Sequence, residues 1–237
     1  MITRKTVRLG IAVLLAASFI GTAQMVQAGE PCSSCADCQA KLVSGLWPTV
    51  VLTADIIDHA GDCIGLNFGE SDVIFDCNGH VIDSDGADVN PEHGISIRHG
   101  SGITITNCTI SDFDTGILLV EASDIVASSN QVFSNHIGIE LTNVESVLIS
   151  DNTVSSNSTG IKISSSISND LISNFVCGNS LWDIYYANGM DNVGDGNTCD
   201  ATYFWNEGGT PGCTFTCSVF VDGFETGNCG AWTLMTE

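Results

Sequence analysis

Short aliphatic runs, separated by polar residues and glycine, recur along the middle of the chain. The phrase Gly-Ile-x-aliphatic begins at Gly94, Gly116, Gly138 and Gly160, a step of 22 residues each time without insertion or deletion. A fixed period in this range is typical of solenoid proteins. Helical periodicity is absent, and each unit holds three runs of strand length. The pattern therefore predicts one coil of a parallel β-helix per repeat, with each strand paired to its equivalent one coil away.

Strand alternation predicts which positions of each coil face the core. In the first run of each coil the predicted inward positions are Ile95/Ile97, Ile117/Leu119, Ile139/Leu141 and Ile161/Ile163. A second aliphatic column contains Ile110, Val132, Val154 and Val176. A polar column, just before the second aliphatic one, contains Asn130, Asn152 and Asn174. We expect these asparagines to adopt left-handed turn geometry and to hydrogen-bond to the same residue above and below.

The repeat continues in looser form on both sides of its regular part. Residues 50–56 fit a strand of an opening coil, and residues 169–179 complete the coil that begins at Gly160. We therefore expect an all-β solenoid of about six coils over residues 46–185. Terminal coils expose apolar edges and need caps. Two Cys-rich segments, 29–45 and 186–217, are placed to supply them.

The first 28 residues have the pattern of a secretory signal peptide. A basic start precedes an apolar run that is too short for a membrane span, and small residues end at Ala28. We expect a mature chain from near Gly29 that is secreted, extracellular or at the cell surface, with the periplasm as an alternative. No later segment is long and apolar enough to cross a bilayer.

Loss of the signal peptide makes the charge more one-sided. Three of the six basic residues leave, so Lys41, Arg98 and Lys162 face 28 acidic residues and the net charge falls from −22 to about −25. Such a surface repels nucleic acid and anionic lipid, and we expect no nucleic-acid partner. It attracts divalent cations, or it serves only solubility and protection of strand edges.

Eleven cysteines follow the predicted signal peptide, and in an exported chain they favour disulfides. The candidates are Cys32, Cys35, Cys38, Cys63, Cys77, Cys177, Cys199, Cys213 and Cys217. The odd total leaves at least one cysteine unpaired or paired between chains. The spacing of Cys32, Cys35 and Cys38 also fits metal ligands, but no fourth ligand is obvious, and we favour disulfide staples. The sequence leaves the pairing open.

The repeat, with the segments LTADI, GDCIGL, SDVIFDCNGHVID and SGITITNCTISDF, resembles the right-handed parallel β-helix repeat proteins, which have a pectin lyase-like fold. Within them it looks like the NosD-like group, also described as carbohydrate-binding and sugar-hydrolysis repeats. The resemblance covers about residues 45–185 and implies a right-handed coil, secretion and a bias toward polysaccharide. The tail, 218–237, contains a stretch that resembles a short C-terminal motif of exported bacterial proteins, either a sorting tag or a domain-end fragment.

In related polysaccharide lyases and hydrolases the substrate groove lies along the first strand of each coil. The outward positions there are Ser96/Arg98, Leu118/Val120, Glu140/Thr142 and Lys162/Ser164. A hydrolase needs two carboxylates at the scissile bond, and a lyase needs a base and a cation for the substrate carboxylate. The face offers only Glu140, which we expect to pair with Lys162 one coil on. The best catalytic candidates are Arg98, Asp112, Asp114 and Glu140.

An insertion at residues 83–92 interrupts the period and should project beside the same face, just before Arg98. The candidate ligand-binding residues are Asp83, Asp85, Asp88, Glu92, His93 and Arg98. The loop is a solvated acidic loop, a Ca²⁺ site or an acid–base site. Ca²⁺ prefers oxygen ligands, and candidate Ca²⁺ sites are Asp83, Asp85 and Asp88, or Asp191, Asp195 and Asn197. The second group also fits a capping turn.

Three functions remain open. We favour a non-catalytic exported β-helix that binds a polysaccharide or cell-surface glycan or has a structural role. A small polysaccharide lyase or glycosidase acting on acidic glycans, with Ca²⁺ as a possible cofactor, is the alternative. A NosD-like periplasmic maturation factor for a metalloenzyme is the third, against which methionine is scarce and no His/Met copper cluster occurs. Aromatic residues at 182–205 cover the last coil or stack on sugars, and the first-strand positions listed above include none.

Overall fold

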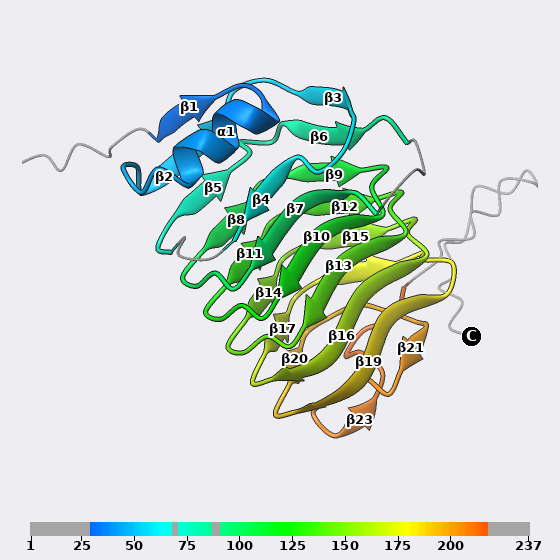
Figure 1. Cartoon of the computed structure of the whole chain (residues 1–237). Coiled ribbons are helices and arrows are strands. Elements are labelled where there is room, and N and C mark those ends of the chain that lie inside the picture. The colour runs from blue at the N-terminus through cyan, green and yellow to red at the C-terminus, as the bar shows by residue number, and fades with distance from the viewer. Residues whose placement is uncertain (1–28, 68–70, 87–90, 218–237) are drawn as a thin grey trace, which may run out of the picture.

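The computed structural model describes residues 29–67, 71–86 and 91–217 and shows strands coiled into a rod around one continuous core (Figure 1). The predicted signal peptide (1–28), the C-terminal motif (218–237) and Asp88 lie outside the described residues. The described part is an all-β, right-handed parallel β-helix, as predicted.

Three parallel sheets form the walls of the rod, and we call them the first, second and third sheet in the order in which a coil meets them. The first sheet contains β4 (Ile64–Leu66), β7 (His93–Arg98), β10 (Thr115–Val120), β13 (Ile137–Thr142), β16 (Thr159–Ile167), β19 (Trp182–Met190) and β21 (Thr202–Tyr203). The second contains β1 (Glu30–Cys32), β2 (Thr49–Leu52), β5 (Ile74–Asp76), β8 (Thr104–Thr106), β11 (Val126–Ser128), β14 (Leu148–Ser150), β17 (Asp170–Ile172) and β20 (Val193–Asp195). The third contains β3 (Ile56–His59), β6 (Val81–Ser84), β9 (Thr109–Ser111), β12 (Gln131–Phe133), β15 (Thr153–Ser155) and β18 (Phe175–Cys177).

The register confirms the predicted core. Ile95 pairs with Ile117, Ile117 with Ile139, and Ile139 with Ile161, one coil apart each time. Every predicted inward residue of the two aliphatic columns is almost fully buried. Each coil therefore buries part of its apolar surface only through contact with its neighbours.

The rod is longer than predicted. The second sheet holds eight strands, so there are about eight coils rather than six. The sequence analysis missed the coils at the two ends because those segments do not contain the Gly-Ile phrase. At one end β1 comes from the Cys-rich segment 29–45 and pairs in parallel with β2, while α1 (Cys35–Leu42) covers the end. At the other end β19 to β21 continue the ladders, and a small antiparallel pair follows, β22 (Asn206–Glu207) and β23 (Thr210–Pro211).

The predicted asparagine ladder is present, and a second one runs beside it. In the first, the Nδ2 and backbone N of Asn130 donate to Asn152 Oδ1, and the bonds repeat on through Asn174 to Asn197. The second contains Asn135, Asn157 and Asn179. Each ladder ends on a buried carboxylate, Glu207 for the first and Asp183 for the second. The expected left-handed geometry was wrong by one position, because the residues that precede the asparagines have positive φ (Ser129, Asp151 and Ser173).

The repeated glycines mark the closest approach of neighbouring coils. A Cβ on Gly138 would lie 2.6 Å from the carbonyl oxygen of Gly160 and 2.6 Å from Cγ1 of Val154. Gly94, Gly116 and Gly160 are equally crowded by the next coil. Backbone atoms cannot yield to an added methyl group, so only glycine fits this column.

Five disulfides confirm the staple interpretation of the cysteines. The pairs are Cys32–Cys38, Cys35–Cys63, Cys77–Cys108, Cys177–Cys217 and Cys199–Cys213. Four of them tie the two capping regions, and Cys77–Cys108 links two adjacent coils. All nine predicted cysteines are bonded, and the prediction missed Cys108. The backbone N of Cys108 donates to Asn130 Oδ1, so this disulfide lies directly beside the first asparagine of the first ladder.

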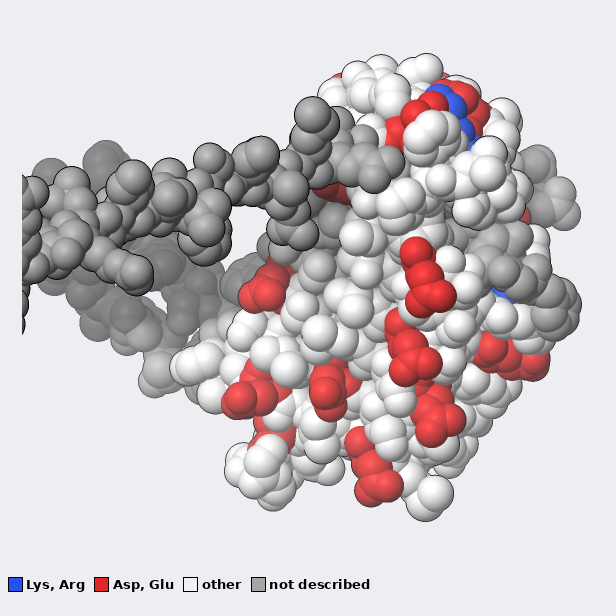
Figure 2. Space-filling view, turned by 90° about the vertical axis from the view of Figure 1, so that its left-hand side faces the viewer, with Lys and Arg blue, Asp and Glu red and all other residues white. Residues whose placement is uncertain are grey.

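Acidic side chains dominate the charged groups on the side of the rod shown in Figure 2, where few basic groups are visible. None of the helices in the described part is long and apolar enough to span a membrane.

Candidate functional site

The outward face of the first sheet carries one column of side chains along the rod. Register places Ser96, Leu118, Glu140, Lys162 and Tyr185 on successive strands from β7 to β19. Tyr203 on β21 follows Tyr185. The sequence analysis listed this face only as far as β16. Its prediction that the face has no aromatic residue was therefore wrong for the C-terminal end.

At the other end of this face, His93 and Arg98 meet across β7. Nη2 of Arg98 lies 3.5 Å from Nε2 of His93. The residues are five apart along a strand that rises about 3.3 Å per residue, so both side chains must lean along it toward each other. Ser96 lies between them and is buried. The two candidates therefore lie side by side, and their role in binding a ligand stays a prediction.

Burial controls the charge of His93, whose exposed fraction is 9%. Burial lowers the pKa of His93 below its usual value, and the Arg98 charge lowers it further. The charges of Asp62, Asp114 and Glu140 oppose this shift. The backbone N of His93 also donates to Asp62 Oδ1 at 2.8 Å. Asp62 was missed by the sequence analysis, because nothing in GDC indicates a bond to a residue 31 positions away.

The tautomer of His93 follows from its neighbour. A guanidinium can only donate, so Nε2 accepts and the neutral ring carries its proton on Nδ1. That Nδ1 is buried and has no hydrogen-bond partner. A neutral imidazole therefore supports the Arg98 guanidinium without neutralising it.

Arg98 is the one cation of the described chain that forms no ion pair with a described carboxylate. Lys41 pairs with Glu30 and Asp37, and Lys162 pairs with Glu140 at 2.9 Å. The predicted Glu140–Lys162 pair is thus present, which leaves Glu140 engaged rather than free for acid–base chemistry. In a chain with 28 acidic residues, a guanidinium that pairs with none of the described carboxylates is an unusual feature.

The acidic candidates divide between two places. Asp114 acts on His93 through its charge. Asp83 and Asp112 instead form a pair beside the third sheet, where Ser111 Oγ donates to Asp83 at 2.5 Å. Burial raises the pKa of Asp112, and its hydrogen bond with the Asp83 carboxyl and the Asp83 charge raise that pKa further. The protonated form of Asp112 is therefore favoured beside Asp83.

The remaining loop candidates are tied into the fold. Glu92 accepts a hydrogen bond from Ser84 Oγ at 3.2 Å, and Asp85 also has a partner. Of the other predicted Ca²⁺ group, Asp191 and Asp195 lie around β20, but Asn197 belongs to the first ladder, where its Oδ1 accepts two bonds from Asn174. Its side-chain oxygen is committed to that ladder, so we place Asn197 there rather than in a cation site.

The aromatic cluster sits at the C-terminal end of the first sheet. The rings of Tyr185 and Tyr203 stack 4.8 Å apart and nearly parallel, and Trp182 and Phe204 pack against Tyr203 at steep angles. Several ring faces are therefore covered by one another, which suits the predicted role of closing the last coil.

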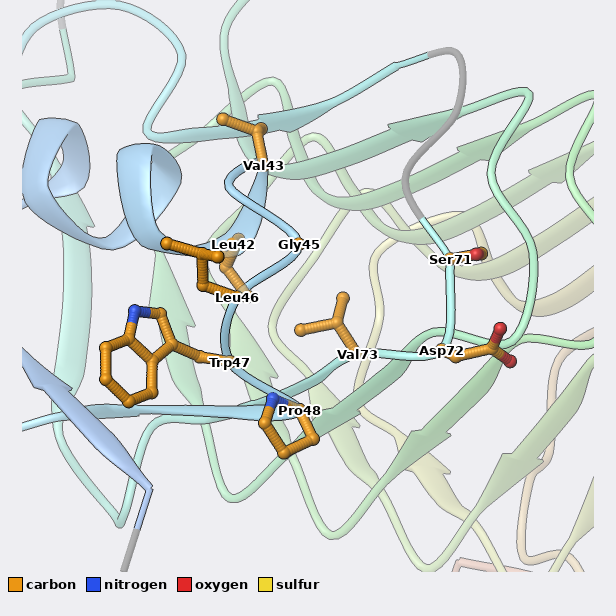
Figure 3. Close-up of a pocket in the computed structure, with 9 residues that line it drawn as sticks. All are labelled: Leu42, Val43, Gly45, Leu46, Trp47, Pro48, Ser71, Asp72 and Val73. Atoms are coloured by element: carbon orange, nitrogen blue, oxygen red, sulfur yellow. The ribbon is translucent and has the colours of Figure 1, made fainter.

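A pocket of about 370 Å³ lies at the N-terminal end, and none of the sequence-predicted candidates is among its lining residues (Figure 3). The end of α1 and the segment after it form one side, and Ser71, Asp72 and Val73 form the other; the residues of the first side are Leu42, Val43, Gly45, Leu46, Trp47 and Pro48. Leu46 and Val43 are largely exposed. No pattern in the sequence pointed to this pocket, because its walls come from irregular segments.

One group of side chains has the composition of a metal site. A ligand atom each from Cys35, His59 and Cys63 lies within 4.8 Å of the other two. Among the described residues, no other set of three or more His, Cys, Asp or Glu side chains comes so close. The two sulfur atoms are bonded to each other in a disulfide.

The fold is similar to that of a solved alginate lyase structure. An alginate lyase from Paenibacillus sp. is similar over 71% of this chain and 65% of the lyase, with 12% identity and a TM-score of 0.58. The A-module of a mannuronan C-5 epimerase from Azotobacter vinelandii is similar over 70% of this chain and 54% of its own, with 10% identity and a TM-score of 0.43. The chain thus spans slightly less than two thirds of the lyase, and at such identities the likeness is one of fold alone.

Comparison with curated protein sequences finds no match. A family model described as periplasmic copper-binding protein (NosD) matches residues 51–211, which is most of the described rod. The match includes every Gly-Ile repeat and both asparagine ladders. The chain therefore belongs to the NosD family of parallel β-helix proteins.

Proposed function

We propose that this protein is an exported β-helix that binds an acidic polysaccharide on the outward face of its first sheet, with Arg98 holding a uronate carboxylate. The observation that carries the proposal is the Arg98 guanidinium, which forms no ion pair with a described carboxylate although the chain is strongly acidic. A planar guanidinium matches the two oxygens of a carboxylate, and the pair is strong when partly shielded from water.

His93 makes Arg98 a better receptor for an anion. Because its ring is neutral and accepts only one hydrogen bond from Arg98, the other guanidinium N–H groups stay available for a ligand. A carboxylate of the protein in the same place would cancel the charge. Asp62, Asp114 and Glu140 are close enough to influence His93, yet none forms an ion pair with Arg98.

The column of side chains from Ser96 to Tyr185 runs along the rod, so we expect such a ligand to lie along the rod as well. Strands of the first sheet are about 4.8 Å apart, so a polysaccharide lying along the rod meets a new side chain at each strand. Beyond Arg98 the column passes Leu118, which is only 6% exposed, and reaches the Glu140–Lys162 pair, which offers both hydrogen-bond donors and acceptors. Among the described residues, Arg98 is the one Lys or Arg side chain of this face that pairs with no described carboxylate, which favours a sugar that carries a carboxylate at one position.

The proposed place of action is outside the cytoplasm, in the periplasm or at the cell surface. Five disulfides require an oxidising compartment, and the family is described as periplasmic. The pattern of residues 1–28 supports export in the same way.

A second candidate function is β-elimination of the same glycan. The contact between a neutral imidazole and a guanidinium favours it, because a lyase needs a base beside a cation. Against it, the unpartnered Nδ1 of His93 is buried and Nε2 faces Arg98. Turnover would therefore require the His93 ring to move when substrate binds.

Calorimetry with alginate, polygalacturonate and a neutral glucan, each with Ca²⁺ and with chelator, tests the proposal. We expect binding of the acidic polymers and at least a tenfold loss of affinity in Arg98→Ala, since a charged hydrogen bond contributes about 1.5–3 kcal/mol. Lys41→Ala removes an equal charge from the cap and is the matched control. Equal affinity for the neutral glucan, or an unchanged affinity in Arg98→Ala, would exclude the proposed role. Ultraviolet absorbance of unsaturated uronates in the same samples distinguishes elimination from binding alone.

A further inference from the structure

His93 has a buried imidazole in which only one nitrogen can gain a proton. The side chain is 9% exposed, and its Nδ1 has no hydrogen-bond partner among the described residues. Its Nε2 lies 3.5 Å from Nη2 of Arg98, which can only donate, so the neutral ring already carries its proton on Nδ1. A second proton can therefore be added only at Nε2, on the side of the ring that faces Arg98.

Charged groups from four places along the chain act on this ring. Asp62 precedes β4, Arg98 ends β7, Asp114 precedes β10 and Glu140 lies on β13. Burial lowers the pKa of His93 most, and the Arg98 charge lowers it too, whereas the charges of the three carboxylates raise it. Because burial and Arg98 outweigh the carboxylates, the site without a ligand favours a neutral imidazole.

A carboxylate bound to Arg98 changes this balance. It offsets the guanidinium charge and places a negative charge beside Nε2, and both effects favour the protonated ring. A protonated Nε2 can no longer accept a hydrogen bond from Arg98, so the contact between the two side chains is exchanged for donation from each of them to the ligand. Two donors 3.5 Å apart can serve the two oxygens of one carboxylate.

We propose that His93 is the second half of the carboxylate receptor, and that its Nε2 takes up one proton when a uronate binds to Arg98. The inference rests on the proposed function and adds a second recognition residue and a pH dependence to it. The proton comes from the solvent, stays on Nε2 while the ligand is bound and returns to the solvent on release. The His93–Arg98 pair thus carries one positive charge when it is empty and two when it is occupied.

The direction of the pH dependence follows from these two states. The ring holds a proton more tightly in the occupied site than in the empty one, so affinity rises as pH falls through the interval between the two pKa values. Uptake of a single proton limits this rise to about tenfold per pH unit. A carboxyl group of the ligand titrates near pH 4, as Asp and Glu side chains do. A pH dependence above about pH 5 therefore belongs to the protein.

The competing explanation is that His93 only holds the Arg98 side chain in place. The ring would then stay neutral with and without ligand, and binding would take up no proton at this position. His99, the residue after Arg98, offers a matched control for a histidine that is merely nearby. Its Nδ1 lies 3.0 Å from Oε2 of Glu121.

Calorimetry with polygalacturonate between about pH 5 and 8, in pairs of buffers with different ionisation enthalpies, measures both the affinity and the number of protons taken up. For the wild type we expect uptake that approaches one proton per bound chain, and an affinity that rises by up to about tenfold per pH unit as pH falls. The His93→Gln side chain keeps an acceptor for Arg98 but cannot titrate, so this variant should lose the proton uptake. His99→Gln should retain it.

Nitrogen NMR of the wild-type imidazole gives a second readout that does not depend on any variant folding. At about pH 6.5, Nε2 of His93 should become protonated when polygalacturonate is added, and a ring that stays neutral would contradict the inference. Binding without proton uptake, uptake that survives His93→Gln, or uptake that disappears in His99→Gln would also overturn it while leaving the proposed function intact. Absence of binding at every pH would overturn both.

Discussion

The asparagine ladders predict a large loss of stability from one small substitution, Asn152→Ala. The Asn152 side chain is 1% exposed. Its Oδ1 accepts from the backbone N and Nδ2 of Asn130 at 2.9 and 3.0 Å, and its Nδ2 donates to Ala127 O and to Asn174 Oδ1, both at 2.9 Å. Alanine removes all four bonds and leaves the two Asn130 donors facing an apolar methyl group.

The magnitude follows from those stranded groups. A buried donor without a partner costs about 1–3 kcal/mol, so two of them cost about 2–6 kcal/mol, with a central value near 4. For a chain of this size each kcal/mol lowers the melting temperature by about 2–4 °C. We therefore expect a decrease of about 8–16 °C, out of a total stability of about 5–15 kcal/mol.

Urea and thermal unfolding of the oxidised protein, followed by circular dichroism, measure this loss. Thr153→Ala is the matched control, because Thr153 is the next residue and is exposed on β15; its effect should stay within about 1 kcal/mol. Asn157→Ala in the second ladder should behave like Asn152→Ala, since it loses the same kind of bonds. If Asn152→Ala costs no more than the control, water or a local shift satisfies Asn130, and the reasoning about the ladder is refuted.

Three further predictions concern packing, pH and salt. Gly138→Ala should destabilise the rod by several kcal/mol or prevent folding, because the new Cβ would lie 2.6 Å from Gly160 O; a soluble variant with an unchanged melting temperature would contradict the crowding. Burial lowers the pKa of His93, so between that lowered value and about 6.5 the unfolded chain binds a proton that the folded chain does not, and stability falls as pH decreases through this window. His93→Gln should remove this contribution, which urea midpoints at several pH values would show. The net charge of about −25 repels a polyuronate, so affinity should rise from low salt to about 0.15 M as screening sets in; a steady fall with salt would mean that attraction to many cations dominates.

The regular coils were predictable because their contacts repeat. A 22-residue period fixes both which residues stack and which face the core, and the register from Ile95 to Ile161 follows without further information. The ends were not predictable, because β1 and β21 each join their sheet through a single strand pairing and their sequences do not follow the repeat. The site was partly predictable: the His93–Arg98 neighbourhood follows from one strand, whereas Asp62 and the Cys35–His59–Cys63 group depend on contacts between segments far apart in sequence.

The exact repetition of the glycine column and the ladders has a consequence for how such a chain changes over generations. A segment such as 116–137 carries on both of its sides the contacts that its neighbours already make. Genetic exchange could therefore copy or delete one coil in frame, and each contact between neighbouring coils would be of a kind that the rod already contains. Each copy would lengthen the rod by about 4.8 Å while both caps stay as they are. The length of the outward face can thus change in evolution by one coil at a time, without a change in the sequence of any existing coil.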